Sequence, residues 1–400
     1  MGFQVVLLSL ALLATLGGGR VAGDAPQDVS PDSDGKYTVV APGIRASFVP
    51  YGASLSNLYL NDSKGIERDI AVGWDNASYY SEDPLHAHLG AVPGRYANRI
   101  KNASFEIDGQ TYNVSANDND GADSLHGGAD GWDWRNFTVA AHTTSSITFS
   151  IVDPDGTSGY PGEVISYVTY TLSEMSWHAK MIAIATTKKT PIGLTQHAYW
   201  NLDGFQNDET PTALNHTLSL PYAGQRVGVD SILIPTGDIL ANAKGSVNDF
   251  WSAPKQMGAS FDDPDMPGNC GADCEGYDNC YILNRTPEEH CAWRDRPVAS
   301  VASAFTGIQM DVYTDQAALQ VYSCTQQNGS TILKETQGLD DRPRVVEPQG
   351  CVVLEAQEWI DAVNHPEWRR GERNIFGPDT GPYTLEVSFN FTIDGPLLAG

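Results

Sequence analysis

Basic residues are scarce in this chain of 400 residues. Lys and Arg number 24 against 50 Asp and Glu, which gives a formal net charge of −26. Because an acidic surface repels phosphate backbones and anionic lipids, we expect neither nucleic acid nor a membrane as a partner. Charged residues make up only 18% of the chain, whereas hydrophobic residues make up 41%, enough to build a folded core.

The sequence also lacks long apolar runs. One short apolar run lies near the N-terminus. Val5–Leu16 is apolar but too short to span a bilayer comfortably, and small residues follow it up to Gly23. This pattern is typical of a signal peptide over residues 1–23, although no Lys or Arg precedes the run. A buried N-terminal helix or strand is the alternative. We expect a secreted, extracellular protein.

Two further features favour secretion. Asn-X-Ser/Thr sequences are glycosylation acceptors, and so many of them predict a glycoprotein. They begin at Asn61, Asn76, Asn102, Asn113, Asn136, Asn215, Asn284, Asn328 and Asn390. The six cysteines all follow residue 269, and in an oxidising compartment they indicate disulfide bonds whose pairing the sequence leaves open. A zinc site is the alternative, but the spacings match no strong zinc pattern.

Alternation of apolar and polar residues dominates the rest of the chain, and long helical periodicity is absent. Asp108-Gly109 separates two β-rich halves in the manner of a hairpin turn. Other runs typical of strands are 146–152, 163–172, 178–185, 217–220, 308–314, 318–324, 351–357 and 383–393. The pattern predicts an all-β fold, a large and mostly antiparallel sandwich. Since no linker divides residues 24–400, we expect one domain there, with 262–276 as an inserted loop.

Three residues stand out as candidates for acid–base chemistry. His126 precedes two glycines, and His197 lies beside two aromatic residues; histidine titrates near neutral pH. Taken singly, an ordinary loop histidine and a core histidine are the better interpretations. Glu355 lies in an otherwise apolar strand, where desolvation would raise its pKa toward that of a useful base. A buried ion pair is its alternative.

Four polar residues are candidates for binding. Asn98 and Arg99 offer several hydrogen-bond donors, although Arg95 and Arg99 could equally hold surface carboxylates. Asp278 offers a carboxylate on a turn, and Gln320 offers an amide on a strand.

The ordered set of motifs resembles the aldose 1-epimerase (mutarotase) family over residues 51–391. The motifs are GAVPGRYANRI (90–100), LHGG (125–128), TPIGLTQHAYWNL (190–202), LIPTGDI (233–239), GYDN (276–279) and LEAQEWIDAVNHP (354–366). The resemblance implies a galactose mutarotase-like supersandwich that interconverts the α and β anomers of a free aldose such as galactose or glucose. It implies no metal and no cofactor, with a monosaccharide as the partner.

The resemblance also implies a role for each candidate. His197 resembles the general acid that protonates the ring oxygen, and Glu355 the general base that takes the C1 hydroxyl proton. His126 resembles a second histidine near the ring oxygen or a neighbouring hydroxyl. The sugar-hydroxyl binders are then Asn98, Arg99, Asp278 and, as a lesser contact, Gln320.

Departures from the family pattern put the preferred sugar in doubt. They include Ala198, Ala356, Asn279 and the run after LHGG. Three other functions stay open. They are a non-catalytic sugar-binding protein on the same scaffold, a hexose-6-phosphate epimerase that needs a basic phosphate pocket, and a glycoside hydrolase that needs paired carboxylates.

Overall fold

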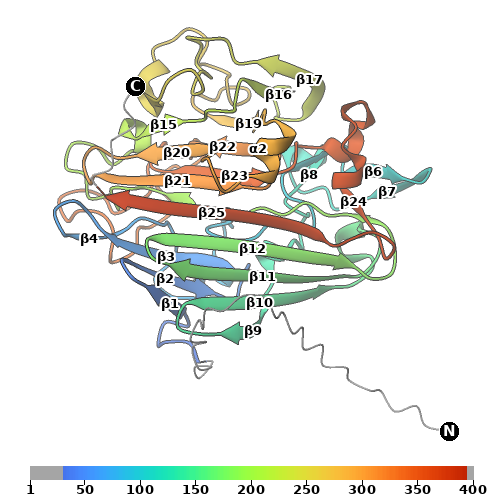
Figure 1. The fold of residues 1–400 in the computed structure, drawn as a ribbon, viewed down its shortest axis with the longest axis horizontal. Helices are drawn as coiled ribbons and strands as arrows, with labels where there is room; N and C mark the ends of the chain where they lie inside the picture. The colour runs from blue at the N-terminus through green and yellow to red at the C-terminus, as the bar shows by residue number, and fades with distance from the viewer. Residues whose placement is uncertain (1–29, 394–400) are drawn as a thin grey trace.

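The computed structural model describes residues 30–393 and is built almost entirely of β-strands (Figure 1). Every pairing between its named strands is antiparallel, so the predicted antiparallel β-sandwich is confirmed. The described part has two short α-helices, α1 (Tyr79–Glu82) and α2 (Pro287–Cys291). No helix in residues 30–393 has the length and hydropathy of a membrane span. The predicted signal peptide, 1–23, lies outside the described residues.

The largest sheet has nine strands, and its long central strands cross the front of the molecule in Figure 1. Burial alternates residue by residue along these strands, as expected for a sheet with one face on the core. In spatial order the strands are β18 (Lys255–Gln256), β15 (Thr217–Ser219), β20 (Ala299–Ala302), β21 (Ile308–Thr314), β25 (Tyr383–Ile393), β12 (Ser176–Ala185), β11 (Val164–Ser173), β10 (Ser146–Asp153) and β9 (Thr138–His142).

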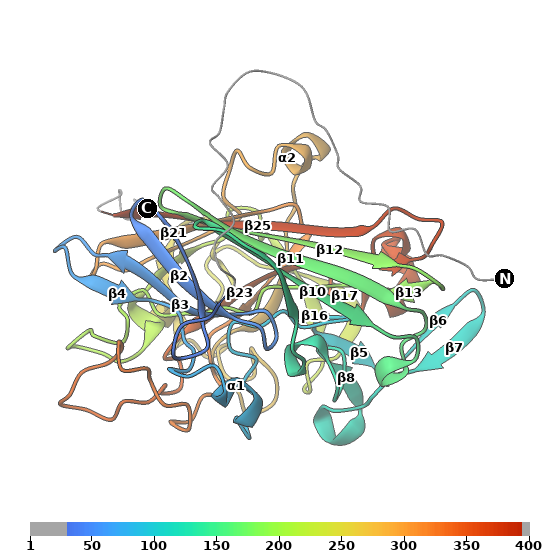
Figure 2. The ribbon, with the colours of Figure 1, turned by 90° about the horizontal axis from the view of Figure 1, so that it is seen from below.

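Two smaller sheets lie on the inner side of the nine-stranded sheet, and α2 lies on its outer side (Figure 2). The six-stranded sheet contains β14 (Tyr199–Trp200), β23 (Val352–Gln357), β22 (Ala318–Tyr322), β19 (Asp278–Ile282), β16 (Gln225–Val229) and β17 (Pro235–Ala241). The four-stranded sheet contains β1 (Tyr37–Ala41), β2 (Ile44–Val49), β3 (Ser54–Asn61) and β4 (Glu67–Asp69).

Three two-stranded pairs complete the named strands. They are β5 (Arg99–Lys101) with β8 (Asp123–Leu125), β6 (Ser104–Ile107) with β7 (Gln110–Asn113), and β13 (Thr190–Pro191) with β24 (Ile375–Phe376). The β6–β7 pair is the predicted hairpin. Its turn residues Asp108 (φ 52°) and Gly109 (φ 81°) both have the positive φ that a tight two-residue hairpin turn requires.

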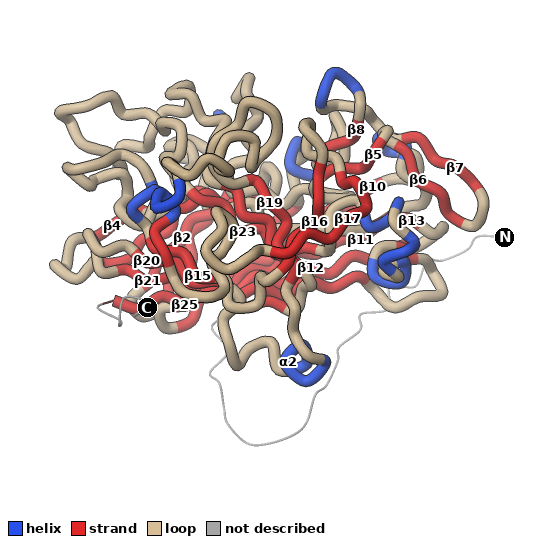
Figure 3. Tube along the Cα trace, turned by 90° about the horizontal axis from the view of Figure 1, so that it is seen from above, coloured by secondary structure: helices blue, strands red, loops and turns tan. Residues whose placement is uncertain are grey.

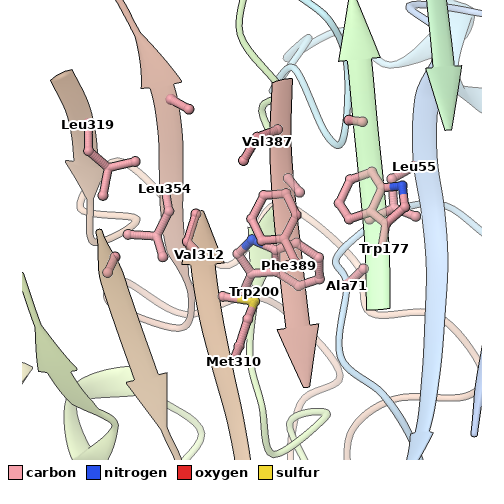
Figure 4. Close-up of a cluster of buried hydrophobic side chains, with 14 of the residues drawn as sticks. Leu55, Ala71, Trp177, Trp200, Met310, Val312, Leu319, Leu354, Val387 and Phe389 are labelled. Carbon is pink, nitrogen blue, oxygen red and sulfur yellow. The ribbon is translucent and has the colours of Figure 1, made fainter. Parts of the chain in front are cut away.

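The core between the sheets is aromatic and aliphatic (Figure 4). Trp177 on β12 stacks on Phe389 on β25 with ring centroids 4.9 Å apart, and Trp200 packs against both rings. Leu319 on β22 and Leu354 on β23 face this cluster from the six-stranded sheet. Because side chains alternate along a strand, the neighbours of these leucines point to the opposite face.

The disulfide prediction is only partly right. Cys270 pairs with Cys274 and pins the predicted inserted loop, and Cys324 pairs with Cys351. Cys280 and Cys291, also expected in disulfides, are free thiols. Cys280 lies on β19 within a buried apolar cluster, where burial raises the pKa of its thiol to about 12, whereas Cys291 is exposed at the end of α2.

Candidate active site

One face of the six-stranded sheet carries the predicted carboxylates. Leu354 points into the core, so its neighbour Glu355 points to the other face. The register places Gln320 on β22 directly opposite Glu355, and Asp278 begins the next strand, β19. Figure 3 shows loops gathered on the side of the molecule away from α2. The face of the six-stranded sheet that carries these side chains points toward this side. Neighbouring strands thus bring residues 278, 320 and 355 together.

His197 reaches the same face from the segment that leads into β14. Its backbone N–H donates to the carbonyl of Ala91 at 2.9 Å, and the N–H of Gly90 donates to the carbonyl of His197 at 3.0 Å. Gly90 has φ 66°, and a Cβ there would lie 2.0 Å from the carbonyl oxygen of Leu55. Only glycine allows this close approach to Leu55. The two backbone hydrogen bonds hold the histidine segment against residues 90–91.

His126 is fixed by the residues that precede β5. The backbone N–H of Asn98 donates to Nδ1 of His126 at 3.1 Å, and the N–H of His126 donates to the carbonyl of Asn98 at 3.2 Å. Because a backbone N–H can only donate, Nδ1 is the acceptor and the ring proton lies on Nε2. Burial, and then the charge of His88, lower the pKa of His126 well below its ordinary value, so this imidazole is neutral.

These side chains line a cavity of about 260 Å³. Of the seven predicted site residues, Asn98, Arg99, His126, His197, Asp278 and Glu355 line it. Gln320 does not line it, but its amide donates to Asp278 Oδ1 at 2.6 Å. The remaining wall contains Leu85, His86, Ala87, His88, Leu125, Tyr199, Tyr322, Gln326, Gln327, Asn328, Ser330, Thr331. The structure brings the predicted set together, while the roles of its members stay predictions.

Glu355 and His197 form a buried pair in the cavity. Oε1 of Glu355 lies 3.6 Å from Nε2 of His197, and both side chains are buried. Burial, reinforced by the charge of Asp278, raises the pKa of Glu355 well above its ordinary value. Burial also lowers the pKa of His197 to about 3. Burial thus favours the uncharged form of each group, a protonated carboxyl group and a neutral imidazole.

Arg99 is the only Lys or Arg side chain among the described residues that line this cavity. It pairs with Asp118 at 2.9 Å and lies 3.5 Å from Asp123. Arg95 has a different function: it is buried and pairs with Asp153 at 2.7 Å outside the cavity. The two arginines do not share a strand, since β5 begins at Arg99.

The sequence interpretation missed a second polar cluster in the cavity wall. His86 Nε2 and His88 Nδ1 lie 2.8 and 2.5 Å from the same carboxylate oxygen of Asp133. The signal was present as His86-Ala87-His88, two residues before the GAVPGRYANRI motif. Two histidines one residue apart in a polar loop carry no periodicity, so nothing distinguished them from ordinary loop residues.

Within residues 30–393, two groups of side chains have donor atoms close enough to hold a metal ion. One consists of His86, His88 and Asp133, and the other of His126, His197 and Glu355; within each group all donor atoms lie within 4.8 Å of one another. Imidazole and carboxylate ligands suit zinc and other transition metals. In the first group, hydrogen bonds to Asp133 already engage one nitrogen of each histidine. The prediction that the protein uses no metal stays a prediction.

Comparison with known proteins gives a consistent result. The family model described as aldose 1-epimerase matches residues 35–374. A probable aldose 1-epimerase of Arthroderma benhamiae is 39% identical over 383 residues, 89% of this chain and 86% of the relative. A galactose mutarotase of Sus scrofa is 32% identical over 333 residues, 83% and 88% of the two chains. The crystal structure of an aldose epimerase homologue from C. elegans superposes with a TM-score of 0.76 at 25% identity, covering 90% of this chain and 99% of that one. The chain therefore belongs to the aldose 1-epimerase family, the isomerases that interconvert the anomers of free aldoses.

Proposed function

We propose that this protein is a mutarotase of free aldoses, with Glu355 and His197 as its proton-transfer pair. The observation that carries the proposal is the pairing itself: a buried carboxyl group and a buried imidazole 3.6 Å apart in one cavity. Each has a side-chain atom, Oε2 of Glu355 and Nδ1 of His197, without a hydrogen-bond partner among residues 30–393. Unpaired polar atoms are costly in a buried site and point to a polar ligand.

The reaction needs a proton removed from the C1 hydroxyl and a proton given to the ring oxygen. Glu355 accepts the first and His197 donates the second as the C1–O5 bond breaks, which leaves a C1 aldehyde and a C5 hydroxyl. Rotation about C1–C2 exposes the other carbonyl face. The C5 hydroxyl then returns its proton to His197 as it attacks C1, and Glu355 returns a proton to the C1 oxygen. No proton is gained or lost overall.

This cycle starts from the pair with its single proton on His197. Burial works against this arrangement, since it raises the pKa of Glu355, lowers the pKa of His197 and so disfavours both charged groups. Because the two groups are coupled, they titrate as a unit that holds one proton in either arrangement.

The cavity chemistry supports a neutral sugar as the substrate. Arg99 is engaged by Asp118 and Asp123, so no free cation among the described wall residues is available for a phosphate. Neutral His126 offers an Nε2–H donor, and Asp278 offers an acceptor for hydroxyl groups. The pig relative is named for galactose. We therefore propose galactose, glucose or a related free aldose rather than a sugar phosphate.

A non-catalytic sugar-binding protein is the second candidate. Binding needs hydrogen-bond donors, acceptors and shape, but it does not need a buried carboxyl group whose pKa is raised beside an imidazole whose pKa is lowered. That arrangement costs stability and is typical of acid–base catalysis. We therefore favour the enzyme.

We also propose that the protein is secreted and glycosylated. The apolar run at Val5–Leu16 and the two disulfides support an oxidising destination. Eight of the nine sequon asparagines are exposed, and the ninth, Asn390, is half-buried. Secretory expression followed by mass spectrometry tests both points. We expect an N-terminus near residue 24 and a mass that falls on endoglycosidase treatment; an intact leader and an unmodified mass would contradict the proposal.

The activity itself is tested by polarimetry on freshly dissolved sugars. We expect the protein to speed the rotation change of α-D-galactose, α-D-glucose or a related aldose above the buffer rate, and to leave the anomers of hexose 6-phosphates at the buffer rate. Binding without acceleration for any aldose would favour the binding protein. Acceleration confined to the phosphates would show that the substrate class is wrong.

A further inference from the structure

The carboxylate of Asp133 holds two histidines of the loop at the cavity wall. Both His86 and His88 contact Oδ2 of Asp133, whose side chain has no exposed surface. Burial acts to raise the pKa of Asp133, but the hydrogen bonds from His86 and His88 outweigh it and lower the pKa. Since a carboxylate oxygen can only accept, Nδ1 of His88 carries the proton of this bond. Its other nitrogen, Nε2, is the one left to meet a ligand, and the side chain is 20% exposed.

The position of His88 along the cavity follows from its neighbours. Its ring centroid lies 4.7 Å from that of His126 and 5.8 Å from that of His197. The charges that act on His197 are those of His88 and Asp133.

Asp278 lies on the Glu355 side of the cavity, because Gln320, which lies opposite Glu355 in the sheet, donates to the Asp278 carboxylate at 2.6 Å. Glu355 in turn lies 3.6 Å from His197, and the ring centroid of His197 lies 5.8 Å from that of His88. The contacts therefore run from Asp278 through Glu355 and His197 to His88.

The backbone of this loop supports a functional role. His86 (φ 42°) and His88 (φ 56°) both have the left-handed conformation, and so does His126 (φ 52°) on the opposing loop. Residues other than glycine rarely adopt this conformation, and strained positions are concentrated at ligand-binding sites. The two bonds to Asp133 hold the strained loop in place and aim the His88 ring at the cavity.

The geometry of a pyranose identifies what His88 meets. The ring oxygen is bonded to C1 on one side and to C5 on the other. If Glu355 lies at the C1 hydroxyl and His197 at the ring oxygen, the group beyond His197 is the substituent on C5. In a hexose this substituent is a hydroxymethyl group, and in a pentose it is a hydrogen atom.

We propose that His88 is a specificity-determining residue that hydrogen-bonds the C6 hydroxyl of a hexose through Nε2, and that Asp133 is its positioning residue. The proposal rests on the proposed mutarotase function and adds a preference for hexoses over pentoses. A pocket built to hydrogen-bond a substrate hydroxyl disfavours the analogue that lacks it, because the pocket group is then left unpaired.

The test compares two sugars that differ only at this position, D-galactose and L-arabinose. The variant His88→Phe keeps a planar ring but loses both nitrogens. We expect its kcat/KM for D-galactose to fall about five- to tenfold, the cost of one lost hydrogen bond, while the value for L-arabinose stays within about twofold. The loss is expected mainly in KM, since the contact is present in both ground and transition states.

His86→Gln is the matched control, because His86 binds the same carboxylate oxygen from the same loop. We expect it to change kcat/KM alike for both sugars and to leave the ratio of the two values unchanged. Asp133→Asn is expected to lower the preference for D-galactose over L-arabinose, as His88→Phe does. The double variant should show no further loss of this preference. If His88→Phe is poorly folded by circular dichroism, His88→Asn replaces it.

Equal losses of kcat/KM for both sugars in the His88 variant would overturn the specificity role and leave only a structural one. An unchanged preference in the His88 variant would also overturn it. Failure of the unmodified protein to act on any aldose would instead overturn the proposed function on which this inference rests.

Discussion

Replacing Glu355 with Gln removes the proposed base and keeps the size and shape of the side chain. An amide cannot take up the C1 hydroxyl proton, so the ring-opening step loses general base catalysis, which contributes about 10²–10⁴ in rate. This corresponds to about 3–5 kcal/mol of transition-state stabilisation. The contacts proposed for Asn98, Arg99 and Asp278 with the sugar do not depend on this proton. We therefore expect a loss of that size in kcat and little change in KM.

The same variant has a signature in stability. Burial raises the pKa of Glu355 above its ordinary value of 4.5, so between the unfolded and folded pKa values the native state binds more protons than the unfolded state. Stability from this group is therefore fully present below about pH 4.5 and falls as pH rises, by up to about 1.4 kcal/mol per pH unit. The amide of the variant does not titrate and has no such dependence. We expect Glu355→Gln to match the unmodified protein near pH 4 and to be more stable than it at pH 7.

Anomerisation assays at several galactose concentrations give kcat and KM, and urea unfolding at pH 4 and pH 7 gives the free energies of unfolding. Glu106→Gln is the control, because Glu106 is exposed on β6 and outside the cavity. It should leave both measurements unchanged. More than about a tenth of the activity left in Glu355→Gln would refute the base assignment. A stability difference that does not depend on pH would refute the burial argument.

Three further changes test neighbouring parts of the account. His197→Asn should lower kcat by about 10²–10⁴ as the acid is lost, and near-normal steady-state turnover would contradict that role. Gln320→Met removes the hydrogen bond to Asp278, so we expect KM for galactose to rise about three- to tenfold; an unchanged KM would show that the carboxylate needs no such support. Replacing both Cys324 and Cys351 with Ser opens a crosslink between positions 27 apart, and urea unfolding should show a loss of about 3–4 kcal/mol, whereas an unchanged midpoint would contradict it.

Strands with one face on the core could be predicted from the sequence, and the others could not. Alternation along 146–152 and 308–314 marked β10 and β21, and Asp108-Gly109 marked a hairpin. In β3 the alternation is interrupted by the consecutive polar residues Ser56 and Asn57, where the pairing with β2 shifts register. β14 and β13 are two residues long and carry no pattern at all.

The candidate site was only partly accessible to sequence reasoning. Glu355 stood out alone, because a glutamate in an apolar strand is unusual. His197, taken singly, was better interpreted as a core histidine, and the histidine cluster around Asp133 was missed, since these contacts join segments far apart in the chain. The pairing of Cys324 with Cys351, and the free thiol of Cys280, also depend on long-range packing that composition does not encode.

Magnetisation exchange in NMR tests the central claim most directly. Saturating the C1 proton of α-D-galactose at anomeric equilibrium should reduce the β-anomer signal in proportion to enzyme concentration, because the two forms interconvert in the cavity within the lifetime of the saturation. Glu355→Gln at the same concentration should give the spontaneous exchange rate. No transfer above that rate with the unmodified protein, for galactose or any other aldose, would contradict the account.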